Sequence, residues 1–311
     1  MKIVFFGSPE AALPSLSGLL AAGHSLDLVI TQPDRPAGRG KILTASPVKR
    51  FALGKKIPVL QPEKIRKAPE VLERLAVLRP DVQVVVAYGQ LIPDSILYLP
   101  PHRTLNVHFS LLPKYRGASP VAWSILCGET RTGVTIIELN EKMDEGDILA
   151  QTETEIRPEE NARELESRLA VLGAGLLLST LDGLPSPLRR PQDHRLASYA
   201  PKLKKEDGRL DWSLSAREIS RRVRALTPWP SAFSRLRSRQ VKVVEGRMLA
   251  PQDPLPRPGG TILDISREGI LVQCGQGSYL ITKVQPENRN PMTAHEYSLG
   301  ARLKAGDCFE A

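Results

Sequence analysis

The chain has 311 residues, which exceeds one ordinary hydrophobic core, so its length predicts two domains. Hydrophobic residues make up 41% and charged residues 25% of it, a balance that excludes a disordered or fibrous protein. No apolar run approaches the ~20 residues that span a bilayer, and no secretory signal pattern is visible. We therefore expect a protein without a membrane segment.

The three cysteines, Cys127, Cys274 and Cys308, are far apart and show no metal-type spacing. A sparse, odd set of this kind is typical of reduced thiols in the cytoplasm. We expect a cytoplasmic protein with no metal site.

The formal charge of +9 is unevenly distributed along the chain. Residues 1–185 carry equal numbers of basic and acidic side chains, so the whole excess lies in residues 186–311. Such asymmetry indicates that one half meets a polyanion, although a solvated basic surface explains the charge equally well.

Short apolar strands alternate with helical patterns through the first half of the chain. This alternation predicts a doubly wound, Rossmann-like α/β domain, in which ligands bind beyond the C-terminal ends of the strands. The unbroken apolar run at residues 84–87 is typical of a central strand that is covered on both faces. The expected strands are 2–6, 25–31, 58–60, 82–87, 104–107, 134–139 and 148–155, and the expected helices are 11–22, 47–55, 63–78, 93–98, 119–127 and 162–181.

A proline-rich and basic stretch at 184–191 ends this pattern and is typical of a linker. After a helix at 215–226, short β patterns between glycines and prolines predict a small antiparallel, OB-like barrel. We expect a catalytic domain at 1–185, a basic linker at 186–206 and the barrel at 207–311. The expected strands of the barrel are 232–236, 241–245, 260–265, 269–273 and 278–284.

The first strand-to-helix turn, Gly7-Ser8-Pro9-Glu10, lacks the GxGxxG pattern of dinucleotide-binding folds. We therefore expect no nicotinamide cofactor.

Asn106 and His108 lie two apart at the end of an expected strand, so both side chains point to one face. An amide and an imidazole at that position are placed to bind a polarised oxygen. Downstream, residues 139–149 put several acids in a turn between two strands, where one carboxylate could pair with the imidazole. Buried hydrogen bonding within the core is the alternative explanation for the pair.

The pattern Asn106-x-His108-x-Ser110-Leu111-Leu112-Pro113, with Asp144-x-Gly146, resembles the formyltransferases that use 10-formyltetrahydrofolate. The whole of 110–120 looks like the branch of that family that acts on methionyl-tRNA. So do residues 31–41, Asp211-Trp212-Ser213 and Pro228-Trp229-Pro230, which extend the resemblance over nearly the whole chain. Phe109 departs from the smaller residue of many relatives, and we expect its side chain to point away from Asn106 and His108.

The resemblance implies transfer of a formyl group from N10 of the folate to the α-amino group of methionine on initiator tRNA, for translation initiation. Asn106 and His108 would then donate hydrogen bonds to the developing oxyanion. Asp144 would orient the ring and favour the imidazolium, or move a proton through water. No nucleophilic residue is needed, because the formyl group passes directly between the substrates.

The same resemblance implies contacts for both substrates. The folate is expected along two segments that follow neighbouring strands: Ser110, Leu111, Leu112 and Pro113 after one, and Ala87, Tyr88, Gly89 and Leu91 after the other. The tRNA is expected on the basic loop 33–46, where Arg39 aligns with the key basic position of the family, and on the basic linker and C-terminal domain. The expected tRNA contacts are Arg35, Arg39, Lys41, Lys202, Lys204, Lys205, Arg217, Arg221, Arg222 and Arg224.

Two other hypotheses are open. A formyltransferase for a nucleotide sugar or for glycinamide ribonucleotide would share Asn106, His108 and Asp144. The glycinamide enzyme would not need the basic C-terminal domain, and the sugar enzyme would not need the insertion at 35–41. A non-catalytic RNA-binding protein built on an enzyme fold is the other hypothesis, and the intact set of three residues argues against it. We expect a monomer.

Overall fold

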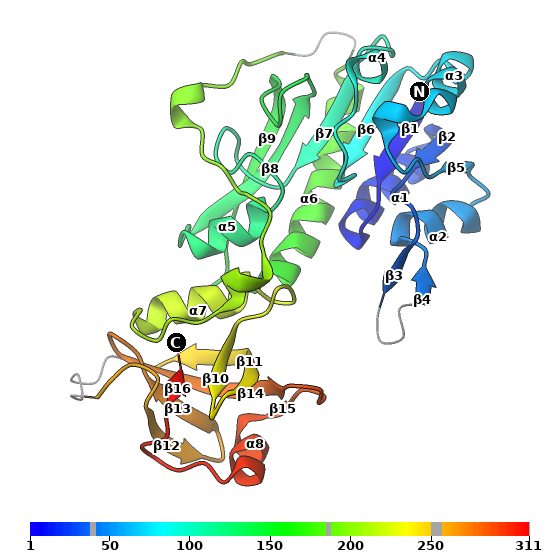
Figure 1. Ribbon diagram of the computed structural model, residues 1–311. Coiled ribbons are helices and arrows are strands. Elements are labelled where there is room, and N and C mark those ends of the chain that lie inside the picture. Colours follow the sequence, from blue (N-terminus) through cyan, green and yellow to red (C-terminus); the bar gives the residue numbers. More distant parts are fainter. Residues whose placement is uncertain (38–41, 185–187, 250–256, 311) are drawn as a thin grey trace. The chain divides into compact units, whose positions relative to one another are not determined.

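A computed structural model describes residues 1–37, 42–184, 188–249 and 257–310 (Figure 1). The chain groups into two compact units. The first comprises Met1–Pro120, Arg131–Glu155 and Glu166–Pro201, and the second comprises Val121–Thr130, Ile156–Leu165 and Lys202–Ala311. Within the described ranges, no helix is both long and apolar enough to cross a membrane.

The first unit is built on a seven-stranded sheet with the order β5-β2-β1-β6-β7-β8-β9 (Figure 1). Five neighbouring strands run parallel, which confirms a Rossmann-like α/β architecture, whereas β8 runs antiparallel to both of its neighbours, β7 and β9. Residues 139–147 join β8 to β9 directly and are too few for a parallel crossover, which needs about a dozen residues or more. The strands are β1 (Lys2–Gly7), β2 (Ser25–Ile30), β5 (Val59–Leu60), β6 (Val82–Val86), β7 (Thr104–His108), β8 (Arg131–Glu138) and β9 (Ile148–Glu155).

Helices cover both faces of this sheet, because successive side chains of its central strands point to opposite faces and are apolar on both. On one face, Val4 and Phe6 of β1 share a core with Val71 of α3. On the opposite face, Gly173 of α6 comes so close to the sheet that an added Cβ would lie 2.8 Å from Val107 of β7. The helices in chain order are α1 (Leu13–Ala21), α2 (Pro47–Gly54), α3 (Pro69–Leu78), α4 (Asp94–Leu97), α5 (Pro120–Leu126) and α6 (Ala162–Asp182).

Two local features differ from the sequence-based expectation. The helix expected at 63–78 is interrupted, and a 3-10 turn (Ile65–Lys67) precedes α3. The interruption falls at Ala68, with φ −120° and ψ 77°, because a residue before proline is driven out of the helical region. The loop expected at 33–46 contains a short hairpin, β3 (Arg35–Ala37) and β4 (Ile42–Thr44).

Residues 188–201 run along the first unit. Arg190 pairs with Ile148 at the start of β9, and Tyr199 pairs with Arg116. Residues 185–187, within the proline-rich stretch at 184–191, lie outside the described ranges.

The second unit contains an antiparallel sheet with the order β12-β13-β14-β11-β10-β16, and β15 pairs with β14. The sheet curls until its two ends meet, since Ile262 N donates to Asp307 O at 2.7 Å and Phe309 N donates to Gly260 O at 2.8 Å. Its core includes Trp212, whose ring lies 5.7 Å from that of Phe309. This confirms an antiparallel C-terminal domain. Its elements are α7 (Ala216–Ala225), β10 (Phe233–Leu236), β11 (Arg239–Met248), β12 (Ile262–Ser266), β13 (Gly269–Gln273), β14 (Ser278–Pro286), β15 (Met292–Thr293), α8 (Ala294–Ala301) and β16 (Phe309–Glu310).

Helix α8 was not expected from the sequence. It begins with a capping box in which Thr293 and Glu296 exchange hydrogen bonds with each other's backbone amides. The Thr-x-x-Glu pattern is visible in the sequence and is a signal for a helix start.

Candidate active site

Asn106 and His108 lie at the C-terminal end of β7 and face the side of the sheet opposite α6. Asn106 pairs with Val85 of β6 and Ile137 of β8, and His108 pairs with Thr135. Both side chains are nearly buried, with 9% and 6% exposed. Phe109 lies on the other face, next to Gly173 of α6, as expected from strand alternation.

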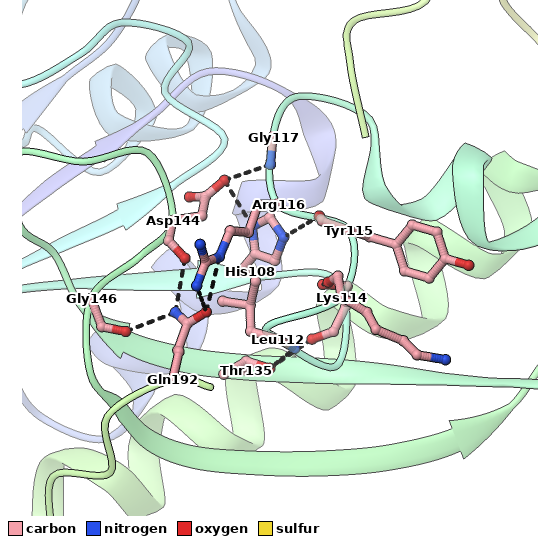
Figure 2. Close-up of polar contacts among 11 residues, drawn as sticks. His108, Leu112, Lys114, Tyr115, Arg116, Gly117, Thr135, Asp144, Gly146 and Gln192 are labelled. Carbon is pink, nitrogen blue, oxygen red and sulfur yellow. Dashed lines mark hydrogen bonds and ion pairs between the residues drawn. The ribbon is translucent and has the colours of Figure 1, made fainter. Parts of the chain in front are cut away.

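The imidazole of His108 is held between a carbonyl and a carboxylate (Figure 2). Its Nε2 lies 3.0 Å from the carbonyl oxygen of Tyr115, and its Nδ1 lies 3.7 Å from Oδ2 of Asp144. Because a carbonyl only accepts hydrogen bonds, Nε2 carries the proton and Nδ1 is the nitrogen that faces the carboxylate. The distance to Asp144 is too long for a hydrogen bond and leaves the pair open to a third group.

Asp144 is held rigidly in the turn between β8 and β9. Its backbone adopts the left-handed region at φ 54°, and its Oδ2 accepts a hydrogen bond of 2.8 Å from Gly117 N. Two residues on, a Cβ on Gly146 would overlap the carbonyl oxygen of Glu138, so only glycine fits there. The turn therefore approaches β8 closely and brings the carboxylate to His108.

Of the three side chains, that of Asn106 makes no hydrogen bond to any other residue in the described ranges, whereas those of His108 and Asp144 do. A largely buried amide normally has partners, and an amide that lacks them in the free protein is available to a ligand. The site therefore combines a free amide donor and an imidazole at the end of β7 with a carboxylate from the turn between β8 and β9.

The segment Ser110–Pro113 follows β7 and is fixed by side chains of β8 and β9. Thr135 Oγ1 donates to Ser110 O at 2.6 Å and accepts from Leu112 N at 3.1 Å, and Gln151 donates to Leu112 O at 2.9 Å. Leu111 lines a pocket of about 430 Å³ with Gln151, Glu153 and Arg190, among others. The polar backbone of the segment is thus largely used inside the protein, while Leu111 and Pro113 remain half-buried.

The second expected segment follows β6. Ala87 and Gly89 both have positive φ, at 48° and 85°, so the chain turns tightly at this strand end. The Tyr88 ring points into the core in an edge-to-face contact with Phe6, and its carbonyl accepts a hydrogen bond of 3.0 Å from Gln32. Leu91 is half-exposed. Contact of Tyr88 with a ligand would therefore involve its backbone.

The basic residues expected to bind tRNA lie in different surroundings. Arg35 is exposed and pairs with Glu63 at 2.9 Å, whereas Arg39 and Lys41 lie outside the described ranges. In the second unit, Lys202, Lys204, Lys205 and Arg217 are exposed, and Arg221 and Arg222 are partly buried. Arg224 instead donates to the Glu160 carbonyl at 2.9 Å, so its guanidinium is engaged in the fold.

The stem of the basic loop is anchored at Asp34. Its carboxylate lies 2.6 Å from the Lys49 ammonium and accepts a hydrogen bond of 2.8 Å from Gln61. These two partners hold the pKa of Asp34 below its ordinary value. The loop thus starts from a fixed point at the C-terminal edge of the sheet.

Gln192 contacts the active-site turn and was not expected from the sequence. It donates hydrogen bonds to the carbonyl oxygens of Asp144 and Gly146, and it accepts from Arg116 (Figure 2). Gln192 directly follows the proline-rich stretch, and no local sequence pattern predicts a functional role for it. Among the described residues, no group of three or more His, Cys, Asp or Glu side chains is arranged to hold a metal ion.

Comparison with known proteins identifies the class. Residues 1–181 match the formyl transferase family, and residues 202–302 match the formyl transferase C-terminal domain. The chain therefore belongs to the formyl transferase family. Methionyl-tRNA formyltransferase from Solibacter usitatus is 46% identical over 306 residues, which cover 97% of this chain and 96% of that protein. The resemblance drawn from the motifs is thereby confirmed.

Solved structures share the fold at lower identity. Methionyl-tRNA formyltransferase from Clostridium thermocellum has a TM-score of 0.59 at 15% identity, covering 80% of this chain and 94% of that one. HypX from Aquifex aeolicus, solved with tetrahydrofolic acid, has a TM-score of 0.67 at 18% identity, covering 96% of this chain but only 47% of HypX.

Proposed function

We propose that this protein transfers the formyl group of 10-formyltetrahydrofolate to the α-amino group of methionyl initiator tRNA. The product is N-formylmethionyl-tRNA, which serves translation initiation. Family membership over both parts of the chain and near full-length similarity to methionyl-tRNA formyltransferases support this activity. The observation that carries the site assignment is the partnerless Asn106 amide beside the His108–Asp144 pair.

The reaction needs no covalent enzyme intermediate. The neutral amine attacks the formyl carbon, a C–N bond forms, and the carbonyl oxygen becomes an oxyanion. Collapse breaks the bond to N10 of the folate, the amine nitrogen loses a proton, and N10 gains one. The protein must therefore bind the oxyanion and move a proton.

Asn106, His108 and Asp144 supply these functions in the proposal. The free Asn106 amide donates to the oxyanion, and a protonated His108 donates through Nδ1, since Nε2 is bound to Tyr115. The Asp144 carboxylate, 3.7 Å from Nδ1, favours the imidazolium and takes up the proton of the amine through a water beside the pair.

The folate is proposed to lie between the two segments that end β6 and β7. Leu111 and Pro113 would supply apolar contacts on one side, with Ser110 and Leu112 shaping the backbone. Ala87, Gly89 and Leu91 would form the other side through the exposed backbone of Ala87 and Gly89 and the half-exposed Leu91 side chain, and the buried Tyr88 would hold this turn in place.

The tRNA is proposed to contact two basic surfaces. Arg35, Arg39 and Lys41 would meet the acceptor stem, and the second basic surface would bind phosphates. That surface comprises Lys202, Lys204, Lys205, Arg217, Arg221 and Arg222. Contacts of this kind position an RNA without reading its sequence.

For the chain as a whole, we propose a catalytic domain at 1–185, a basic linker at 186–206 and an OB-like, tRNA-binding domain at 207–311. The meeting of the two sheet ends in the C-terminal unit supports a barrel of that kind. Three free cysteines support a cytoplasmic protein, which we propose acts as a monomer.

One assay tests the function. Formyl transfer from 10-formyltetrahydrofolate is measured with methionyl initiator tRNA, an amino-sugar nucleotide and glycinamide ribonucleotide as parallel acceptors. We expect formylated methionyl-tRNA as the dominant product. Product on a sugar or glycinamide acceptor alone would contradict the proposal, and so would binding of tRNA without any formyl transfer.

A further inference from the structure

The turn that carries Asp144 is bound from outside by one side chain. Gln192 Nε2 donates to the carbonyl oxygens of Asp144 and Gly146, both at 2.8 Å (Figure 2). Its two N–H groups thus bind the two sides of a turn whose first residue has a left-handed backbone. Gln192 is 6% exposed, so water competes weakly for these bonds.

The orientation of the Gln192 amide follows from Arg116. Arg116 Nε and Nη2 approach Gln192 Oε1 at 3.1 and 2.8 Å. Because a guanidinium only donates, the amide oxygen must face it and the amide nitrogen must face the two carbonyls. Arg116 is itself 1% exposed, and Glu145 lies 3.2 Å from its Nη1, so its charge is compensated within the same turn.

The same network reaches the Asp144 carboxylate from the other side. Gly117, the neighbour of Arg116, donates its backbone N–H to Asp144 Oδ2 at 2.8 Å. Both segments therefore hold Asp144. Gln192 binds its backbone carbonyl, and the backbone N–H of Gly117, next to Arg116, binds its carboxylate.

We propose that Gln192, oriented by Arg116, is a positioning residue for Asp144. Its amide holds the 144–146 turn so that the carboxylate stays at its distance from His108. The inference rests on the proposed catalytic role of Asp144. A misplacement of about 1 Å at a reacting group costs roughly 10²-fold in rate, which is the loss expected when Gln192 ceases to donate.

Gln192→Glu separates positioning from anchoring. The carboxylate still pairs with Arg116 but cannot donate to the two carbonyls. We expect kcat to fall by roughly 10²-fold with KM for folate and tRNA little changed. Normal kcat would overturn the proposal, because it would mean that Gln192 only anchors its own segment. Gln192→Met, neutral and similar in length, carries the same expectation if Gln192→Glu does not fold.

Gln273 is a matched control. Its amide also donates to two backbone carbonyls in a turn, Cys274 O at 2.7 Å and Gly277 O at 3.3 Å, but it lies in the second unit. Gln273→Glu should lower the melting temperature while kcat stays near that of the unaltered protein. An equal loss of kcat in both variants would contradict a specific role for Gln192.

A double-mutant cycle with Asp144→Ala completes the test. If Gln192 acts through Asp144, adding Gln192→Glu to Asp144→Ala changes single-turnover rates by less than about twofold. A full further loss in that background would overturn the proposal. Near-normal turnover of Asp144→Ala alone would instead contradict the proposed role of Asp144, so the two failures are distinguishable.

Discussion

At the residue scale, the candidate site is marked by polar side chains whose hydrogen-bonding groups are not all paired within the protein. His108 has one nitrogen bound to a carbonyl and the other facing a carboxylate, while the Asn106 amide has no partner in the described ranges. A structural polar cluster would satisfy its buried donors. The proposed function assigns the unpartnered Asn106 amide to the substrate.

Removing the free amide should change rate without changing stability. Asn106→Ala is expected to lower kcat by about 10²–10³-fold, because one proposed oxyanion donor is lost, while the melting temperature stays close to that of the unaltered protein. Single-turnover formyl transfer and thermal unfolding measure the two effects.

Asn161→Ala is the reciprocal control. Asn161 accepts from Glu164 N at 3.1 Å in a capping box at the start of α6, so its loss should cost about 1 kcal/mol of stability. Its catalytic rate should be unchanged. A large loss of stability in Asn106→Ala would show that its amide has a structural partner after all.

At the element scale, the strand that carries Asn106 and His108 is supported from behind by α6. Gly173 faces Val107 and Val134, whereas Gly175, half a turn away, has open space around it. The helix can approach the sheet only because Gly173 has no side chain.

These two glycines make a matched pair. Gly173→Ala should destabilise the protein by about 1–3 kcal/mol, because the new methyl group is forced against Val107. Gly175→Ala should stabilise it by about 0.5–1 kcal/mol, because an exposed helical glycine is replaced by a better helix former. Urea unfolding gives both values. Equal effects at the two positions would contradict the close approach of α6.

Helix α7 offers a pH-dependent prediction. The Ser215 hydroxyl and backbone N–H donate to Glu218 and hold its pKa below the ordinary 4.5. Because the folded-state pKa of Glu218 lies below its ordinary value, the ionised carboxylate stabilises the folded protein at pH values above the ordinary pKa. This stability is lost as the pH falls through the lower, folded-state pKa.

Ser215→Ala should therefore cost about 1 kcal/mol at pH 7 and less as the pH falls below 4.5. Thermal melting of both proteins across this range measures the difference. A cost that grows toward acid pH would have the wrong sign.

At the scale of the whole molecule, the net positive charge and the residues proposed for the chemistry lie in different parts of the sequence. The proposed chemistry uses three residues of the first unit, while the whole basic excess lies in residues 186–311. Phosphate contacts release counterions from the RNA, and this release becomes less favourable as the salt concentration rises. KM for tRNA should therefore rise steeply with salt, and KM for folate should not.

Arg39→Ala tests the basic loop. It should weaken use of methionyl-tRNA far more than folate binding, because it removes a proposed phosphate contact and lies outside the segments proposed for the folate. Steady-state kinetics in both substrates measure this. Arg74→Ala, on the exposed face of α3, removes an equal charge and should leave both constants unchanged. Equal losses for both substrates in Arg39→Ala would point to misfolding.

Local sequence was sufficient for most of the fold and for the naming of the family. Strand and helix periods, prolines and the Asn106–Pro113 string depend on neighbours along the chain, so they are legible without the structure. The break at Ala68 and the start of α8 were missed, although a proline and a capping box marked them.

Long-range packing decided the rest. That Asp144 lies beside His108, that the Asn106 amide is left free, and that Gln192 binds the 144–146 turn all depend on residues far apart in the chain. The antiparallel return of β9 and the close approach at Gly146 create those contacts. Neither leaves a local pattern, because the physical requirement is a distance between two chain segments.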